Sequence, residues 1–243
     1  VLSVAESPDG TLWVGTNRGL LRRTDEGWTA QDLPGSRPDP TVHTLFADED
    51  GTVWVGIREA VISLRADGTR VFGPPRGQAW ENVQTIMRDR EGVLWVGAYG
   101  TGLHRLQDGT LRRFVHRSVP SETSVHTLFE DRDGSLWIGS FQFGAFRLRD
   151  SSVSALDASG PLSGDDARAI CKARDGSYWV GVGGYGVEQV RGDMVTRYTH
   201  DDGLPTSTVH SICETSNGDV WLGTEGGATR VRDGKLRTFT TAD

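Results

Sequence analysis

Short apolar runs separated by turn-forming residues recur along the whole chain. Between residues 124 and 156 there are four such runs, SVHTLFED, SLWIG, GAFRLR and VSAL. Asp133-Gly134 separates the first two, and an Asp-Gly pair is a strong hairpin signal because tight turns require positive φ angles. No stretch shows the 3.6-residue period of an amphipathic helix over ten or more residues. The pattern predicts short antiparallel strands and no helix.

This four-run unit is repeated six times. Each copy contains a tryptophan that lies 41 or 42 residues from the next, at Trp13, Trp54, Trp95, Trp137, Trp179 and Trp221. A period of 40 to 45 residues holding four antiparallel strands is typical of β-propeller blades. We therefore predict an all-β protein, a β-propeller of six four-stranded antiparallel blades, forming a single domain over residues 1–243. The expected blades are 1–40, 41–81, 82–123, 124–165, 166–207 and 208–243.

The repeated tryptophan and its neighbours have predicted roles. Inner strands of a blade are covered on both faces, so they read as continuous apolar runs such as LWVG. We expect each tryptophan to fill the space between two blades, and the glycine two residues later to allow close backbone approach. Cys171 and Cys213 occupy a position that is Phe46 or Phe129 in other units, so both are expected to be buried.

The point of the repeat at which the chain begins and ends limits the possible architecture, and the amino-acid composition limits the possible function classes. The chain starts in an innermost strand and ends in an outermost one, so we expect the sixth blade to close the ring on the first, with a fragment of a larger ring as the alternative. It does not start at a methionine, so further upstream sequence is expected.

The 36% hydrophobic content allows a core, and the net charge of −7, without a Lys/Arg block, argues against binding to nucleic acid or an anionic membrane. No apolar run reaches the roughly 18 residues that span a bilayer.

The units resemble the two-component regulator propeller repeat. The likeness rests on the DG-x-LW-[VI]-G core, a following GL-x-RL, and linkers such as HDDGLPTSTV at 200–209. Units two and five depart from it, with IREAVISL and VGGYGVEQV in place of GL-x-RL. The resemblance implies a sensing region of a bacterial histidine kinase or diguanylate cyclase, located outside the cytoplasm, in the periplasm. Because the family has no fixed catalytic set, it implies a non-enzymatic, ligand-binding protein.

Antiparallel order places the Asp-Gly turns on one side and the linkers on the other, and we expect the linker side to bind ligand. The second residue of the first strand is His43, His126 or His210 in three units, and Gln84, Arg168 or Leu2 in the others. In a closed ring these side chains would gather near the channel mouth. Three imidazoles there suit Zn²⁺ or Ni²⁺. The alternative is that each histidine hydrogen-bonds a neighbouring linker.

Aromatic residues on the linker side suggest a platform for a glycan or another small planar ligand. Trp80 has no tryptophan counterpart in other units, and the alternative is that it pins down its own loop. The other candidates are Tyr99, Phe141, Phe143 and Tyr185. Nearby polar residues are Arg18, Arg58, Glu59, Gln142 and Glu225, for which a solvated rim is the default interpretation.

Two other function classes stay open. A metal-dependent lyase resembling the streptogramin-cleaving propellers would use His43, His126 and His210. A protein-interaction scaffold would present a broad apolar or charged patch to a protein partner. The glycines 181, 183 and 186 match a G-x-G-x-x-G pattern, but a hairpin pattern follows, so no nucleotide site is expected. The ligand, the output domain and the oligomeric state are not determined by the sequence.

Overall fold

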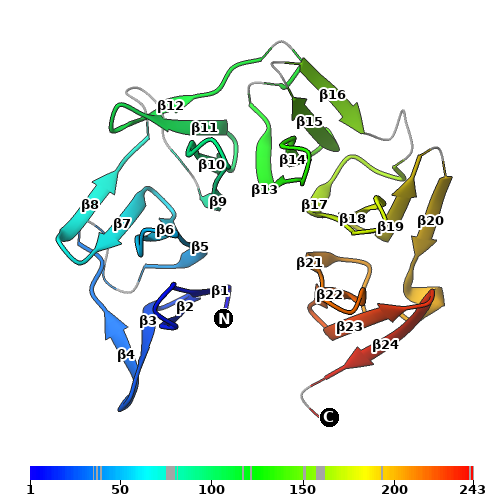
Figure 1. Cartoon of the computed structure of the whole chain (residues 1–243), viewed down its shortest axis with the longest axis horizontal. Coiled ribbons are helices and arrows are strands. Elements are labelled where there is room, and N and C mark those ends of the chain that lie inside the picture. Colours follow the sequence, from blue (N-terminus) through cyan, green and yellow to red (C-terminus); the bar gives the residue numbers. More distant parts are fainter. Residues whose placement is uncertain are drawn as a thin grey trace. The chain divides into compact units, whose positions relative to one another are not determined.

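The computed structural model is built from four-stranded antiparallel sheets, each with its strands in chain order (Figure 1). It describes residues 1–34, 36, 38, 40–74, 80, 82–116, 118–120, 122–149, 152–156, 162–192, 194–240 and 242. There are six such sheets in these residues, which confirms the predicted all-β propeller class with six blades. We number them blade 1 to blade 6. Each sheet lies within one of the predicted blade ranges.

The chain divides into two compact units, Val1–Val115 and His116–Asp243, with three blades each. The strands of the first unit are β1 (Ser3–Glu6), β2 (Leu12–Thr16), β3 (Gly19–Thr24), β4 (Gly27–Gln31), β5 (Val42–Ala47), β6 (Val53–Ile57), β7 (Val61–Arg65), β8 (Gly68–Phe72), β9 (Val83–Arg88), β10 (Leu94–Ala98), β11 (Gly102–Gln107) and β12 (Thr110–Arg113).

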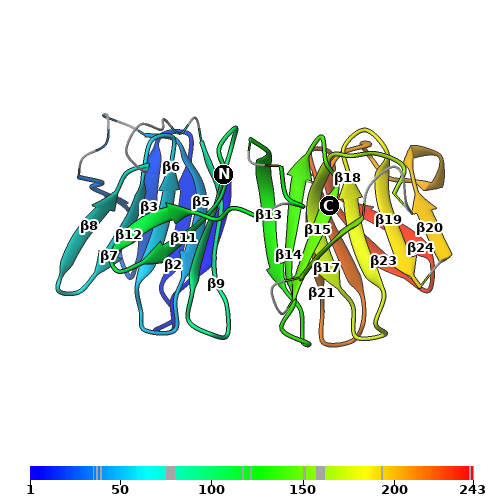
Figure 2. The same cartoon turned by 90° about the horizontal axis from the view of Figure 1, so that it is seen from above.

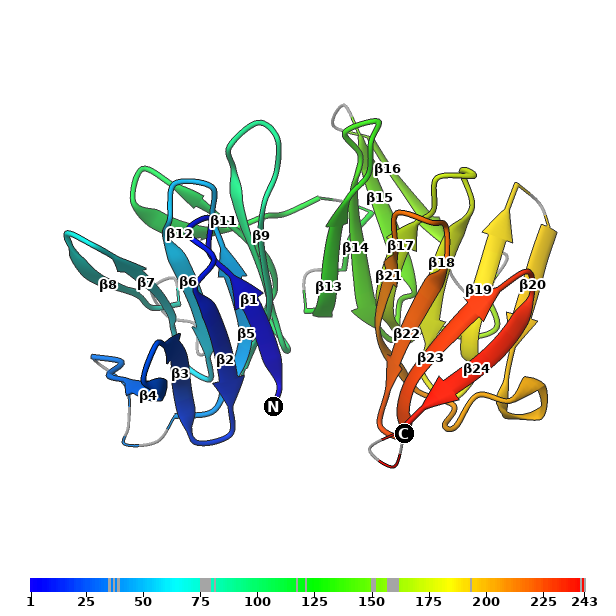
Figure 3. The same cartoon turned by 60° about the horizontal axis from the view of Figure 1, so that its bottom comes forward.

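The second unit repeats the same strand order, and Figure 3 shows its last sheet with the four strands side by side. Its strands are β13 (Ser124–Glu130), β14 (Leu136–Phe141), β15 (Ala145–Arg149), β16 (Ser152–Leu156), β17 (Ala167–Lys172), β18 (Tyr178–Val182), β19 (Gly186–Arg191), β20 (Met194–Tyr198), β21 (Val209–Glu214), β22 (Val220–Thr224), β23 (Gly227–Arg232) and β24 (Lys235–Phe239).

Helical structure is confined to one short turn among the described residues. The 3₁₀ helix η1 (His200–Asp202) lies in the linker before blade 6 and ends at Gly203, whose φ is +104°. In Figure 2 it lies next to β20. In the described part of the chain, no helix has the length and apolar character needed to cross a membrane.

The innermost strands stack side by side within each unit. In the first unit β5 lies between β1 and β9, and in the second unit β17 lies between β13 and β21 (Figure 1). This stacking places equivalent residues of neighbouring blades next to one another.

The repeated tryptophans fill the space between neighbouring blades. Trp13 is buried against Val42 and Val55 of blade 2, and Trp137 is buried against Ile170 and Val180 of blade 5. Trp54 and Trp179 make the equivalent contacts with blades 3 and 6. The predicted interblade role is therefore confirmed at these four interfaces, and burying such large rings contributes strongly to stability.

The glycine two residues after the tryptophan leaves room for the next blade's backbone. A Cβ on Gly139 would lie 2.7 Å from the carbonyl oxygen of Ala167, and one on Gly181 would lie 2.8 Å from that of Val209. Both distances are too short for a methyl group. The predicted close approach is confirmed.

Linkers fold back onto the third strand of the blade that follows them. Trp80, in the linker before blade 3, packs edge-on against His104 of β11 with ring centroids 5.2 Å apart. In the linker before blade 5, the backbone N–H of Ser163 donates to both carboxylate oxygens of Glu188 in β19. His104 and Glu188 occupy the same repeat position, and both are fully buried.

The cysteine prediction is half wrong. Cys171 is buried, and burial raises the pKa of its thiol, but Cys213 is exposed. The shared repeat position predicts the same strand face, whereas exposure depends on what covers that face in each blade.

Candidate functional site

A β-bulge occurs at one repeat position in five of the six blades. In blade 4, Val125 pairs with Ser140 and Thr127 pairs with Gly139, so His126 is the extra residue of the bulge. The same irregularity falls at His43, Gln84, Arg168 and His210. In blade 1 the equivalent Leu2 precedes β1. These are the five polar candidates that the sequence placed at the second residue of the first strand.

The bulges change how these side chains are presented. A bulge breaks the strict in-and-out alternation of a strand and redirects the extra side chain. The glycine contacts described above adjoin this feature, since Ala167 and Val209 immediately precede Arg168 and His210. The bulge position therefore carries a polar residue next to a tightly packed backbone.

In the second unit, His126, Arg168 and His210 form a row across β13, β17 and β21, which we call the bulge row. The guanidinium of Arg168 is held by Asp166, with Nε 2.8 Å from Oδ2. This pair lies over Gly183, where a Cβ would be only 2.2 Å from Asp166 Oδ2. Gly183 thus provides the space that the ion pair occupies.

Electrostatic contacts link the members of the bulge row. Burial lowers the pKa of His126, the carboxylate of Asp166 acts to raise it, and the charges of Arg168 and His210 act to lower it. His126 is therefore neutral near pH 7, with one ring nitrogen able to donate and the other able to accept a hydrogen bond. His210 is about half exposed and has Nε2 3.5 Å from Oε1 of Glu225.

The first unit has a different environment at the same position. The side chain of Asn82, from the linker before blade 3, hydrogen-bonds His43. Burial lowers the pKa of His43, and the nearby charge of Arg58 acts in the same direction. This contact matches the alternative in which the histidine bonds a neighbouring linker. Gln84 is half-buried at the adjacent bulge.

The aromatic candidates do not share one environment. Trp80 is only 3% exposed and lies in a core cluster with Val83 and Leu94, so its ring has no free face for stacking on a ligand. Its packing on His104 corresponds to the alternative in which Trp80 pins down its own loop. Tyr99 is half-buried. Tyr185 is exposed, and its ring lies against Gly164.

Two candidates of the loop between β14 and β15, Gln142 and Phe143, line a cavity, and a third, Phe141, is the last residue of β14. Phe141 packs edge-on against His126 with centroids 6.0 Å apart. Phe143 is exposed and, with Gln142, lines a cavity of about 370 Å³. Gln142 has φ +74°, a left-handed conformation that blades 3 and 5 assign to Gly100 and Gly184. A non-glycine residue in this conformation costs energy and is a common mark of functional loops.

The three-histidine metal site receives no support from the structure. His43 belongs to the first unit, and His126 and His210 belong to the second. Among the described residues, no group of three or more His, Cys, Asp or Glu side chains is arranged to hold a metal ion. The site stays a prediction, for which the melting temperature with EDTA and with added zinc is the test.

The two largest cavities among those described lie on the Asp-Gly turn side, which the sequence did not single out. One of about 840 Å³ lies between blades 1 and 2, and one of about 570 Å³ lies between blades 5 and 6. They are lined by equivalent residues of the repeat, including Trp13 in one and Trp179 in the other. The available signal was a departure from the repeat at Ser7 and Ala173, where blades 2, 3 and 4 have an aspartate.

Solved structures with the same fold come from several functional classes. Virginiamycin B lyase from Staphylococcus aureus is 19% identical, with a TM-score of 0.77 over 98% of this chain and 83% of that one. The extracellular domain of BT3049 from B. thetaiotaomicron, a protein assigned as a hybrid two component system, is 18% identical, with a TM-score of 0.62 over 99% of this chain and 41% of that one. PorZ of Porphyromonas gingivalis, a surface component of the type-IX secretion system, is 16% identical, with a TM-score of 0.67 over 98% of this chain and 38% of that one. At these identities the likeness concerns the fold.

The sequence itself provides the more specific comparison. No curated protein sequence matches the chain. The family model described as Two component regulator propeller matches residues 1–18, 77–100, 118–142 and 203–226. These segments fall in blades 1, 3, 4 and 6 and their preceding linkers, and units two and five, which depart from the pattern in their loops, are not matched. The resemblance recognised from the sequence is confirmed, because four segments of the chain match the two component regulator propeller model.

Proposed function

We propose that this chain is a sensing propeller of a bacterial signalling receptor, that it works outside the cytoplasm, and that it binds a small polar ligand at the bulge row. The family match supports the receptor class. The similarity to the extracellular domain of BT3049 supports the location. The observation that carries the binding site is the set of polar residues held at β-bulges on adjacent inner strands.

The bulge row has groups suited to hydroxyl or carboxylate recognition. Arg168 is oriented by Asp166, and a preorganised guanidinium makes strong, directional hydrogen bonds to ligand oxygens. The neutral imidazole of His126 adds one donor and one acceptor. Phe141 beside His126 offers an apolar edge for a sugar or a planar metabolite. A glycan fragment or small metabolite matches this combination.

The test is a melting-temperature screen of the protein against glycans and small metabolites. A ligand that binds only the folded state raises the melting temperature, and the rise grows with the ratio of ligand concentration to Kd. We expect the shift to be lost in Arg168→Ala and reduced in His126→Ala, and to be unchanged in Arg149→Ala, an exposed position on another strand. If no compound of a broad library shifts the wild-type protein, or if Arg168→Ala responds like wild type, the proposal is wrong.

A lyase is the second candidate, because of the fold shared with virginiamycin B lyase and the proximity of Glu225 to His210. A carboxylate close to a histidine can orient the imidazole for proton transfer. The assay is metal-dependent breakdown of virginiamycin B by the purified chain. Turnover that disappears in His126→Ala would favour the lyase, and absence of turnover with added divalent metals would rule out this substrate.

A further inference from the structure

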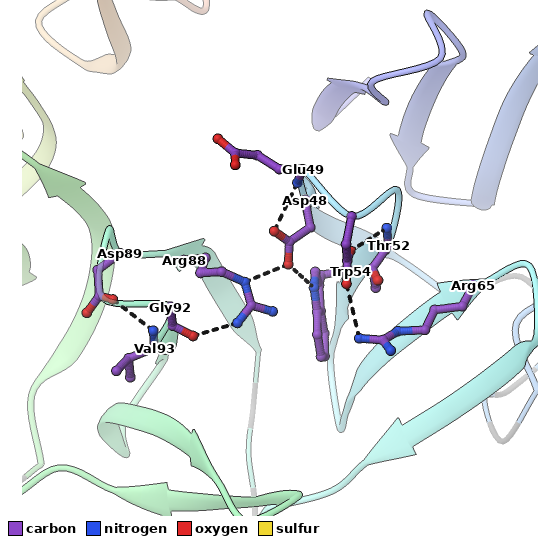
Figure 4. A network of polar contacts seen from close by, with 10 residues as sticks. Asp48, Glu49, Thr52, Trp54, Arg65, Arg88, Asp89, Gly92 and Val93 are labelled. Carbon is purple, nitrogen blue, oxygen red and sulfur yellow. Dashed lines mark hydrogen bonds and ion pairs between the residues drawn. The ribbon is translucent and has the colours of Figure 1, made fainter.

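At two interfaces between neighbouring blades, a cation of the later blade reaches the acid that caps the tryptophan of the earlier blade. Asp48 Oδ2 accepts a hydrogen bond from Trp54 Nε1 at 3.2 Å and lies 2.7 Å from Nε of Arg88, which comes from blade 3 (Figure 4). Between blades 4 and 5 the cation is Lys172. Its Nζ lies 2.6 Å from Oδ2 of Asp133 and 3.5 Å from Oδ2 of the capping Asp131.

Between blades 1 and 2 both members of this pair are replaced. The capping position is Ser7, whose hydroxyl accepts the hydrogen bond of Trp13 Nε1 at 2.7 Å. The cation position, equivalent to Arg88 and Lys172, is Ala47. The turn carboxylate is kept, because Asp9 is equivalent to Asp133. The cavity of about 840 Å³ opens at this interface, and we call it the Asp9 cavity.

The lining of the Asp9 cavity favours a cation. It includes four carboxylates, from Asp9, Glu49, Asp50 and Asp67, against the two guanidinium groups of Arg22 and Arg65. Arg65 forms an ion pair with Asp50, with Nη2 3.5 Å from Oδ2. Asp9 accepts a backbone hydrogen bond from Thr11 through Oδ1, as turn aspartates do.

The guanidinium of Arg22 does not prevent a cation from binding beside it. Arg22 lies over the Trp13 ring at 5.4 Å, and its equivalent Arg147 lies over the Trp137 ring at 5.7 Å. At the Arg147 interface the ammonium of Lys172 is nevertheless held by Asp133. The protein therefore contains an example of how an alkylammonium group is bound in this setting.

We propose that the Asp9 cavity binds a small organic cation through a primary ammonium group, with Asp9 as its counter-ion, in the place that Lys172 occupies between blades 4 and 5. The aliphatic chain of the ligand lies along Leu64, and the exposed hydroxyl of Thr69 is available to polar substituents. Aliphatic diamines and basic amino acids have this chemistry. The proposal goes beyond the sensing site at the bulge row.

The equivalent cavity between blades 5 and 6 is a natural comparison. There the cation position is Glu214, which accepts a hydrogen bond from the backbone N–H of Arg174 at 3.0 Å and lies 3.8 Å from its guanidinium. The turn carboxylate Asp175 forms an ion pair with Arg191. Because its turn carboxylate already has a cationic partner, this cavity is not expected to bind an ammonium group.

The direct experiment is calorimetric titration of the whole chain with cadaverine at low salt, with 1,5-pentanediol as the uncharged analogue. We expect cadaverine to bind and the diol not to bind, with affinity that weakens as salt screens the charges. Asp9→Asn should weaken binding about tenfold, which is the loss of one charge-assisted contact. Asp25→Asn, an exposed carboxylate of the same blade outside the lining, should bind like wild type.

The second variant is Ala47→Lys, which introduces the cation that the repeat has elsewhere. We expect it to abolish cadaverine binding and to raise the melting temperature, because its own ammonium would occupy the site. A peptide with one central lysine distinguishes the sources of the ammonium group: tighter binding than cadaverine indicates a partner protein, and weaker binding indicates a free amine. Equal binding of cadaverine and the diol, or wild-type affinity in both Asp9→Asn and Ala47→Lys, would overturn the proposal while leaving the bulge row untouched.

Discussion

The indole nitrogen of Trp137 donates a hydrogen bond of 3.0 Å to Oδ2 of Asp131, the residue six positions earlier. The same pair recurs as Trp54 with Asp48 and Trp95 with Asp89, and as Trp13 with Ser7. In blades 1, 2 and 4 this pair ties the turn between the first two strands to the ring that fills the space beside the next blade.

Replacing Asp131 by alanine should destabilise the protein by about 3 kcal/mol, because several buried donors lose their acceptor at once. Besides Trp137, the backbone N–H groups of Ser135 and Asp133 donate to this carboxylate, at 2.9 and 3.0 Å. Denaturant unfolding measures the effect, with Asp25→Ala as the exposed control. Similar losses in the two variants would show that the buried carboxylate has no special role.

Truncating Trp137 to alanine should cost about 3 to 5 kcal/mol, as other large core truncations do. Trp137 is 3% exposed, and its ring centroid lies 4.4 Å from that of Tyr178 in blade 5. Removing the ring would therefore leave a cavity between the two blades. Arg149→Ala, at an exposed strand end, should cost little. Equal unfolding free energies for the two variants would contradict the interblade role.

A methyl group at Gly139 should destabilise the protein by about 1 to 3 kcal/mol. Its Cβ would lie 2.5 Å from Thr127 Cγ2 and 2.7 Å from the carbonyl oxygen of Ala167, next to the bulge at Arg168. Gly73→Ala is the matched control, since that Cβ would meet nothing within 4 Å. Thermal melts of both variants test this, and ligand shifts should also fall in Gly139→Ala if the bulge row binds ligand. A Gly139→Ala melt indistinguishable from that of Gly73→Ala would disprove the steric argument.

The stability of the protein should decrease between about pH 6.5 and pH 4 because of His104. Burial lowers the pKa of His104 from 6.5 to about 4, and the charge of Arg113 acts in the same direction. Between these values the unfolded chain binds more protons than the folded chain, so acidification favours unfolding by up to about 3 kcal/mol. His104→Phe, the residue that blade 4 has at this position as Phe146, should remove this component. Unfolding curves at pH 7, 5 and 4 measure it, and an unchanged pH dependence in the variant would refute the assignment.

Much of the fold was predictable because each blade is specified locally. The spacing of the tryptophans, the Asp-Gly turns and the short apolar runs predict six four-stranded sheets, and the strands lie where these patterns indicate. The polar residues at the second position of the first strand were also recognised, because they recur at the same position in five of the six repeat units. The departures in units two and five coincide with the blades that the family model does not match.

The features of the candidate sites were decided only by the tertiary structure, because they depend on contacts between different strands, linkers and blades. A bulge depends on how two strands pair, so the presentation of Arg168 and its contact with Gly183 cannot be deduced from one strand alone. Trp80 has the sequence character of an exposed platform, but packing on His104 buries it. The Asp9 cavity lies at an interface where the repeat has Ala47 in place of the cations Arg88 and Lys172 of other blades, and only the structure shows that a cavity opens there. Burial and electrostatic pairing are properties of neighbours in space, and a repeat determines its own hydrogen bonds more completely than its contacts with the next copy.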